Sequence, residues 1–198
     1  MRFVLVFVTL LGVCASISPA QAGSVIKRVK EHNVVRCGSV ERRGLATEAE
    51  PGGWSGLNVD ICRAIAGEIT TLANIRLDSG VNRLSSRILP ESLTTFPVIA
   101  ATGTEDAQWS AIVAWTVHTL INAERPETPS YAGGAGAMPI SAPEFGLDKQ
   151  WQRRILTSVG NYGSIFDRHL GKGSPLRLDR GLNANHFRGG LLLSPFLE

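Results

Sequence analysis

Residues 57–72 read LNVDICRAIAGEITTL, and this stretch decides the fold class of the chain. Its largest apolar residues recur every four positions and therefore share one face of a helix: Leu57, Ile61, Ile65 and Ile69. The mostly apolar and branched run Val34–Gly38 predicts a buried first strand, and Asn74–Leu77 is predicted to be the second strand. The three segments together predict a β-α-β unit with a right-handed crossover, whose sheet needs cover on both faces.

The rest of the chain is predicted to be mostly helical. A short amphipathic helix is expected at Val25–Glu31, and Arg42–Ser55, which is rich in Gly and Glu, is expected to be a loop. Thr104, Glu105 and Asp106 offer an N-cap and negative charge for a helix that continues to Ala123. Further segments are predicted as follows: helices at Lys149–Val159 and Tyr162–Leu170, a mobile loop at Tyr131–Pro143, and an extended packed tail at Gly189–Phe196.

The N-terminus has the features of a secretory signal peptide. Arg2 precedes the short apolar run Val4–Val13, and the small-x-small pattern Ala20-Gln21-Ala22 predicts cleavage before Gly23. The apolar run is too short for a membrane-spanning helix, so the mature protein is expected in the periplasm without membrane insertion. A lipid anchor on Cys14 is the alternative, although the branched Val13 before it is a poor match to a lipobox.

Removal of residues 1–22 leaves two cysteines, Cys37 and Cys62, in an oxidising compartment. We expect them to form a disulfide between the first strand and the following helix. Two buried free thiols are the alternative.

Composition and motifs argue against several classes of function. The chain has 20 Lys and Arg against 17 Asp and Glu, and the positive charges are scattered, which does not favour nucleic-acid binding. No metal-ligand spacing joins the four histidines, and no nucleophile motif accompanies a serine or cysteine. We therefore expect no metal, no cofactor and no enzyme activity.

Two blocks of sequence resemble one known family. The first contains Val35-Arg36-Cys37-Gly38, Gly53-Trp54, Gly56, Val59-Asp60 and Cys62-Arg63-Ala64. The second begins at Leu89-Pro90-Glu91, continues through Asp106, Gln108-Trp109 and Trp115-Thr116, and ends with the tail Val159–Phe166, Gly173–Leu176 and Arg180–Ala184. With these motifs the chain resembles the periplasmic amino-acid-binding proteins of ABC transporters, of the polar or general L-amino acid type.

The resemblance implies a fold and a domain organisation. Members of that family are two-lobed clamps, but here only about a dozen residues separate Asp78 from Leu89, which leaves no room for a second lobe. We expect an α/β fold with one solute-binding-protein-like lobe, in which helices flank a small, mostly parallel sheet. Residues 1–22 would be the signal peptide and residues 23–198 the lobe, with a β-α-β part at 23–88 and a mostly helical part at 89–198.

The resemblance also implies a function and candidate ligand contacts. In the family, an arginine of the first lobe meets the ligand carboxylate and an acidic residue of the second lobe meets its ammonium group. We expect an exported component related to amino-acid uptake whose binding of an amino acid or other small solute is weak or altered, with Gly44, Leu45, Ala46 and Arg87 at the ligand. Arg87 is alternatively a polar connector. The competing hypothesis is a degenerate lobe that binds another protein, such as a permease, or a second copy of itself.

Overall fold

The structure is a computed structural model that describes residues 23–51, 53–69, 74–80, 99–125, 147 and 150–195. A β-α-β unit forms its centre: β1 (Val34–Val40), α2 (Leu57–Ile69) and β4 (Asn74–Gly80). β1 and β4 are parallel and in register from the pair Val34–Asn74 to the pair Val40–Gly80. The helix that the four-residue repeat predicts and the two strands are therefore confirmed.

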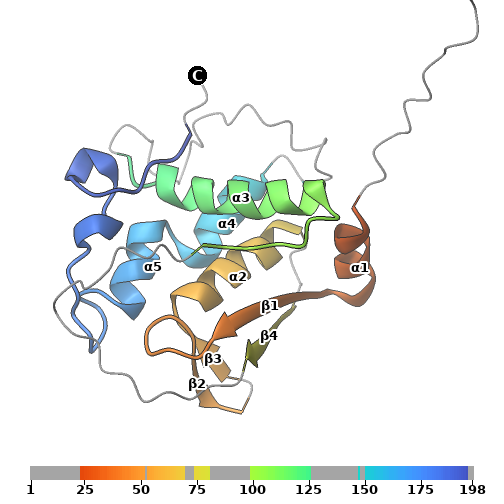
Figure 1. Cartoon of the computed structure of the whole chain (residues 1–198), viewed down its shortest axis with the longest axis horizontal. Coiled ribbons are helices and arrows are strands. Elements are labelled where there is room, and N and C mark those ends of the chain that lie inside the picture. The colour runs from red at the N-terminus through yellow and green to blue at the C-terminus, as the bar shows by residue number, and fades with distance from the viewer. Residues whose placement is uncertain are drawn as a thin grey trace, which may run out of the picture.

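Three more helices pack against α2: α3 (Ala107–Asn122), α4 (Trp151–Val159) and α5 (Tyr162–His169). Figure 1 shows these helices gathered with α2 on one side of the β1–β4 pair, while α1 (Ser24–His32) lies at the start of β1. The fold is thus mixed helix and sheet, as expected. It corresponds to one lobe with a small sheet.

One correction concerns the segment Arg42–Ser55, which was expected to be a loop. It contains an antiparallel hairpin of β2 (Thr47–Glu50) and β3 (Gly53–Ser55), with an irregular register between Glu48 and Glu50. The two strands are too short and too polar to give the alternating pattern by which strands are recognised in sequence. The described strands accordingly form one parallel pair and one antiparallel pair.

A second correction concerns the burial of β1. Along β1, exposed residues alternate with covered ones: Val35 is buried and Cys37 half-buried, whereas Arg36, Gly38 and Val40 are exposed. This period of two means that α2 covers one face of the strand. In the part of the chain that the structure describes, nothing covers the other face, so the predicted two-sided burial is wrong there.

The core consists of two clusters of buried side chains. The larger lies among the helices and includes Ile112, Leu120, Ile155, Ile165 and Phe166. The smaller joins α1, β1, α2 and α3 through the following residues: Val29, Val35, Cys62, Ile65, Ala66 and Val113. The predicted apolar face of α3 is confirmed, since Ile112, Val113, Thr116 and Leu120 are all buried.

The helix ends follow from local sequence. Asp106 caps α3 by accepting a hydrogen bond from the Trp109 amide at 2.9 Å, and Asn161 caps α5 through the Ser164 amide at 2.9 Å. Gly160 ends α4 with φ of 83°, a backbone conformation that favours glycine. The helix boundaries predicted from these residues hold to within two residues.

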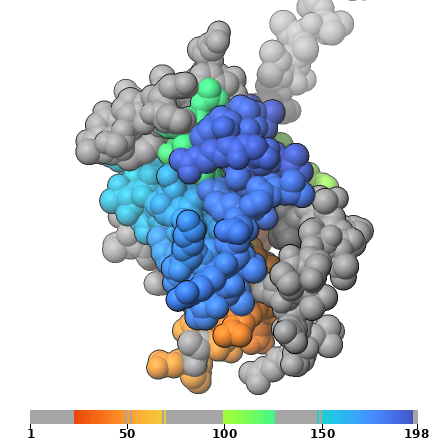
Figure 2. Space-filling view, turned by 90° about the vertical axis from the view of Figure 1, so that its left-hand side faces the viewer, coloured from red at the N-terminus to blue at the C-terminus, as the bar shows by residue number. Residues whose placement is uncertain are grey.

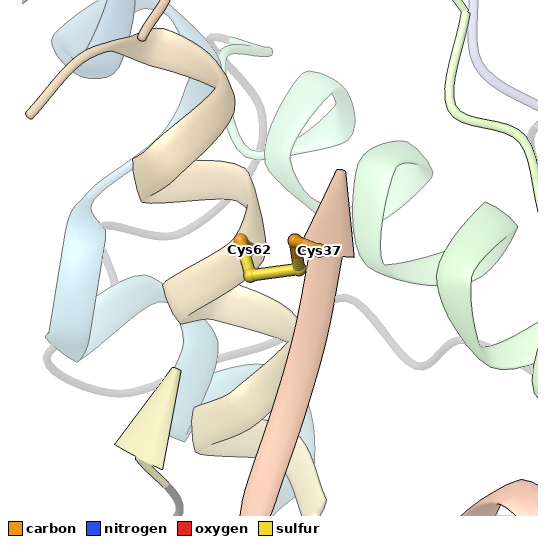
Figure 3. Close-up of a disulfide and its surroundings, with 2 residues drawn as sticks. All are labelled: Cys37 and Cys62. Atoms are coloured by element: carbon orange, nitrogen blue, oxygen red, sulfur yellow. A yellow bond between two sulfur atoms is a disulfide. The ribbon is translucent and has the colours of Figure 1, made fainter. Parts of the chain in front are cut away.

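The disulfide between Cys37 and Cys62 is present, as predicted. It links β1 to α2 across 25 residues, with 6.4 Å between the two α-carbons (Figure 3). Because Cys62 is only 2% exposed, the bond lies inside the smaller core cluster. It therefore fixes the helix to the strand on the covered face of the sheet.

After α5, the chain forms a compact C-terminal segment with two short 3-10 helices, η2 (Gly181–Asn183) and η3 (His186–Arg188). In Figure 2 this segment, in blue, spreads over one face of the molecule, with the N-terminal residues in orange below it. The tail was expected to pack through its leucines, but Leu191 and Leu193 are 68% and 66% exposed. Polar contacts hold it instead: Ser194 donates to the His118 carbonyl at 3.2 Å and Asn122 to the Pro195 carbonyl at 3.2 Å.

Candidate ligand-binding face

The carboxyl ends of β1 and β4 lie at the same edge of the sheet, where Val40 pairs with Gly80. In open α/β sheets, ligands bind outside the carboxyl ends of the strands. We use the name strand-end face for residues 39–46, which comprise the end of β1 and the turn after it. Val40 is an apolar side chain at this edge and is 55% exposed.

A tight turn forms the second half of the strand-end face. Arg42 and Ala46 exchange two backbone hydrogen bonds of 2.9 Å. The carbonyls of Gly44 and Leu45 accept hydrogen bonds from the first amides of α2, those of Leu57 and Asn58, at 2.9 Å each. The turn therefore caps α2, and these two amides are not open to the carboxylate of a ligand.

Three of the four residues predicted at the ligand lie together in this turn. Ala46 is fully buried and the Leu45 side chain packs against the larger core cluster. Gly44 has φ of 79°, and a β-carbon at this position would lie 2.8 Å from the His169 carbonyl oxygen. These three residues could contact a ligand mainly through their backbone atoms. Arg87 lies outside the described residues, and the ligand role of all four stays a prediction.

The same turn carries two cations that were not among the predicted contacts. Arg42 and Arg43 are both exposed and are separated from the end of β1 by Glu41. A guanidinium group is the side chain best suited to pair with a carboxylate in two-point geometry. The signal in the sequence was an Arg-Arg pair at the start of the predicted loop Arg42–Ser55, which follows the first predicted strand.

A buried carboxylate, Asp60 on α2, holds the C-terminal helix in place. Asp60 accepts hydrogen bonds from Arg63 at 2.7 Å and from Arg168, and His169 Nε2 lies 2.7 Å from its Oδ2. Burial would raise the pKa of the Asp60 carboxyl, but the hydrogen bonds from His169, Arg63 and Arg168 hold that pKa below its usual value. The cluster of Asp60 with Arg63, Arg168 and His169 thus joins α2 to α5.

A second ion pair joins α3 to the C-terminal segment. Arg180 contacts both carboxylate oxygens of Glu124, whose side chain is 4% exposed, and also donates to the Asn183 carbonyl at 2.6 Å. The guanidinium carbon lies 5.3 Å from the Tyr162 ring centre and 5.6 Å from that of Phe166. Burial raises the pKa of the Tyr162 hydroxyl, which the positive charge of Arg180 opposes and the negative charge of Glu124 reinforces.

In both clusters a buried carboxylate is paired with arginine, and both contain residues of the blocks that carry the resemblance: Asp60 and Arg63 belong to the first block and Arg180 to the tail. The clusters are therefore supports of the lobe. Across the described ranges, no three histidine, cysteine or acidic side chains are grouped as metal ligands would be. Nor does any helix in those ranges have the length and apolar character needed to cross a bilayer.

The sequence of this chain is similar to those of known binding proteins. No family model matches the chain. The general L-amino acid-binding periplasmic protein AapJ of Rhizobium johnstonii is 36% identical over 124 residues, which cover 54% of this chain and 36% of AapJ. The chain is similar to part of an amino-acid-binding protein.

Two further relatives agree. The putative amino-acid ABC transporter-binding protein YhdW of Escherichia coli K12 is 30% identical over 148 residues, covering 68% of this chain and 43% of YhdW. The glutamate/glutamine/aspartate/asparagine-binding protein BztA of Rhodobacter capsulatus is 30% identical over 125 residues, covering 54% of this chain and 36% of BztA. These relatives are named as binding proteins, not enzymes. The chain spans less than half the length of each of them.

A solved structure supports the fold. An ABC transporter periplasmic binding protein from Brucella ovis, with glutathione bound, matches with a TM-score of 0.62 at 21% identity. The match covers 85% of this chain and 97% of that one. The predicted resemblance to periplasmic binding proteins, and the fold class drawn from it, are thereby confirmed.

Proposed function

We propose that this chain is an exported component related to amino-acid uptake by ABC transporters, and that it binds its ligand weakly or in an altered way. The observation that carries this proposal is the similarity to AapJ over 124 residues, which covers little more than a third of that protein. The predicted signal peptide and the similarity to AapJ, which is named a periplasmic protein, support a periplasmic location.

Weak binding follows from the chemistry of the ligand. A free amino acid carries a carboxylate and an ammonium group, and each loses water on binding and needs a charged partner. Small-molecule sites normally bury about 70–90% of the ligand surface. One open lobe offers the strand-end face on one side of the ligand only, so much of the ligand would stay in water.

The proposed site combines the strand-end face with Arg87. The turn at Gly44, Leu45 and Ala46 contributes backbone, and a cation receives the ligand carboxylate. Arg87 is the predicted cation, and Arg43 is the alternative because it is exposed on the turn itself.

Calorimetric titration tests this proposal. The panel contains glutamate, glutamine, aspartate, asparagine and glutathione, since the last also carries an α-amino acid end. We expect binding with a Kd of about 0.1 mM or weaker for at least one of them. Arg87→Ala should abolish it, whereas Arg177→Ala, at an exposed position of the C-terminal segment, should leave it unchanged.

Two results would contradict the proposal. Tight binding, with a Kd near 1 μM, would show that one lobe is enough to enclose the ligand. The absence of a measurable binding heat for every ligand of the panel would contradict the binding hypothesis. Loss of binding in Arg43→Ala but not in Arg87→Ala would move the carboxylate contact to the turn.

The second candidate function is association with another copy or another protein. It is favoured by the uncovered face of β1, on which Arg36, Gly38 and Val40 are exposed. Val40 is the apolar residue of the three, and association through this face would remove its side chain from water. Light scattering after size exclusion would reveal a dimer, and Val40→Glu should return it to monomer if this face is the contact.

A further inference from the structure

Gly23 is the first residue that the structure describes, and it is buried. Its backbone nitrogen donates a hydrogen bond to Gln108 Oε1 at 2.7 Å, across 85 residues of sequence. The start of α1 is therefore attached directly to the first turn of α3.

Asp106 lies at the same point. One of its carboxylate oxygens accepts from the Trp109 amide at 2.9 Å, and the other accepts from the Val25 amide at 3.0 Å. The carboxylate lies so close to the α-carbon of Gly23 that any β-carbon there would overlap with it. Glycine is thus required at position 23 by the space that Asp106 occupies.

Among the described residues, no cation pairs with the Asp106 carboxylate. The residue is only 7% exposed, yet no lysine, arginine or histidine within the described ranges forms an ion pair with it. Two amide hydrogen bonds compensate part of the loss of water, but a buried negative charge is stabilised far better by a positive partner.

Signal-peptide cleavage would supply that partner. The pattern Ala20-Gln21-Ala22 predicts hydrolysis of the peptide bond between Ala22 and Gly23. One water molecule is consumed: Ala22 leaves with a carboxylate, and Gly23 keeps an α-amino group that is protonated at neutral pH. A neutral amide with one N–H then becomes an ammonium group with three N–H donors.

We propose that Asp106 and Gln108 form a binding site for the α-ammonium group of the processed chain. Gln108 already holds the Gly23 nitrogen, and the Asp106 carboxylate lies against the adjacent α-carbon. The new group forms a charge-assisted pair with Asp106 and keeps its hydrogen bond to Gln108. Processing at Gly23 therefore adds an ion pair that the precursor lacks, and the exported form is the more stable one.

This inference rests on the proposed export, and it is independent of ligand binding. The test starts from the full-length precursor, which is exported by bacterial cells, and an intact mass establishes where the mature chain begins. A second precursor carries one extra alanine between Ala22 and Gly23, which moves the ammonium group one residue away from Asp106. Both are also made in the Asp106→Asn background, because asparagine can still cap α3.

We expect the extra alanine to lower the Tm by about 2–4 °C when Asp106 is present, the shift that an interaction of this class gives in a chain of this size. In the Asp106→Asn background the shift should vanish. An equal shift in both backgrounds would overturn the ammonium site while leaving export intact. A mature chain that begins at another residue would overturn the inference together with the proposed cleavage position.

A labelling experiment keeps the test decisive if Asp106→Asn does not fold. The α-amino group of the wild-type mature chain reacts with an acylating reagent near neutral pH, and the rate is read by mass spectrometry. We expect the folded chain to react several-fold more slowly than the same chain in denaturant, and Gln108→Ala to recover part of the rate. Equal rates in the folded and denatured chains would contradict the site.

Discussion

Arg180 binds Glu124 through two nitrogen atoms across 56 residues of sequence, and thereby fastens the C-terminal segment to the end of α3. Both side chains are largely buried, at 16% and 4% exposure. Such a pair is difficult to replace, because removing one partner leaves the other buried without compensation.

We expect Arg180→Lys to lower the free energy of unfolding by about 2 kcal/mol, since lysine keeps the charge but lacks the planar guanidinium group that bonds both carboxylate oxygens and the Asn183 carbonyl. Urea unfolding followed by circular dichroism measures the change. Arg177→Lys is the matched control, because Arg177 is exposed, and it should have an effect below about 0.5 kcal/mol. Equal stability of the two variants would show that Arg180 contributes no more than a surface arginine.

Asp60→Asn should lower stability at neutral pH by about 2–3 kcal/mol. This is below the range for a fully buried pair, because Arg63 and Arg168 reach solvent. The measurement is again the free energy of unfolding in urea at pH 7.

The same variant should change the response to acid. The pKa of Asp60 is lowered in the folded protein, so its contribution is complete above the unfolded value of about 3.9 and is lost as the pH falls through the folded value. Thermal unfolding from pH 7 to pH 2 should show a shallower acid decline for Asp60→Asn than for wild type. Asp179→Asn, at an exposed position, is the control, and an unchanged acid profile in Asp60→Asn would contradict the prediction.

Replacing Cys37 and Cys62 together by serine should destabilise the protein by about 3 kcal/mol, the value expected for a bond that closes a loop of this length. The wild-type chain should lose the same stability when unfolded with a reductant present. The double variant should be insensitive to reductant. Two titratable free thiols in the unfolded, unreduced wild-type protein would show that the bond does not form.

Substitutions at two glycines distinguish a position where packing requires glycine from one where a larger residue is tolerated. Gly44→Ala should cost about 2–4 kcal/mol, because φ is 79° and the new β-carbon would press on Leu170, Leu176 and the His169 carbonyl. Gly38→Ala, on the exposed face of β1, meets no atom within 4 Å and should change stability by less than about 1 kcal/mol. Thermal unfolding compares the two, and a silent Gly44→Ala would contradict the packing of the turn.

The helices and the parallel strands could be predicted from the sequence, because each depends on a local repeat. The four-residue spacing from Leu57 to Ile69 and the capping residues Asp106 and Asn161 act within one or two turns. The disulfide followed from the expected oxidising compartment and from the number of cysteines left after residue 22. Predicting these features requires no information about contacts between residues that are distant in the sequence.

The long-range features could not be predicted in this way. Asp60 is 108 residues from Arg168, and nothing in the spacing of the residues indicates that they meet. The hairpin at β2 and β3 contacts α2, where Arg63 donates to the Trp54 carbonyl at 2.9 Å, and the short hairpin sequence gives no indication of this contact. The exposed leucines of the tail were misjudged because an apolar run indicates burial only on average.

The position of Asp60 also sets the order in which this chain can mature. Until residues 168 and 169 arrive, the N-terminal unit holds a carboxylate that lacks two of its three partners and cannot be buried without penalty. The N-terminal unit consequently gains little stability from folding before the rest of the chain has been synthesised. For the export proposed above, such a delay would keep the polypeptide in the unfolded form in which chains pass through a secretion channel, and the lobe would be completed after translocation.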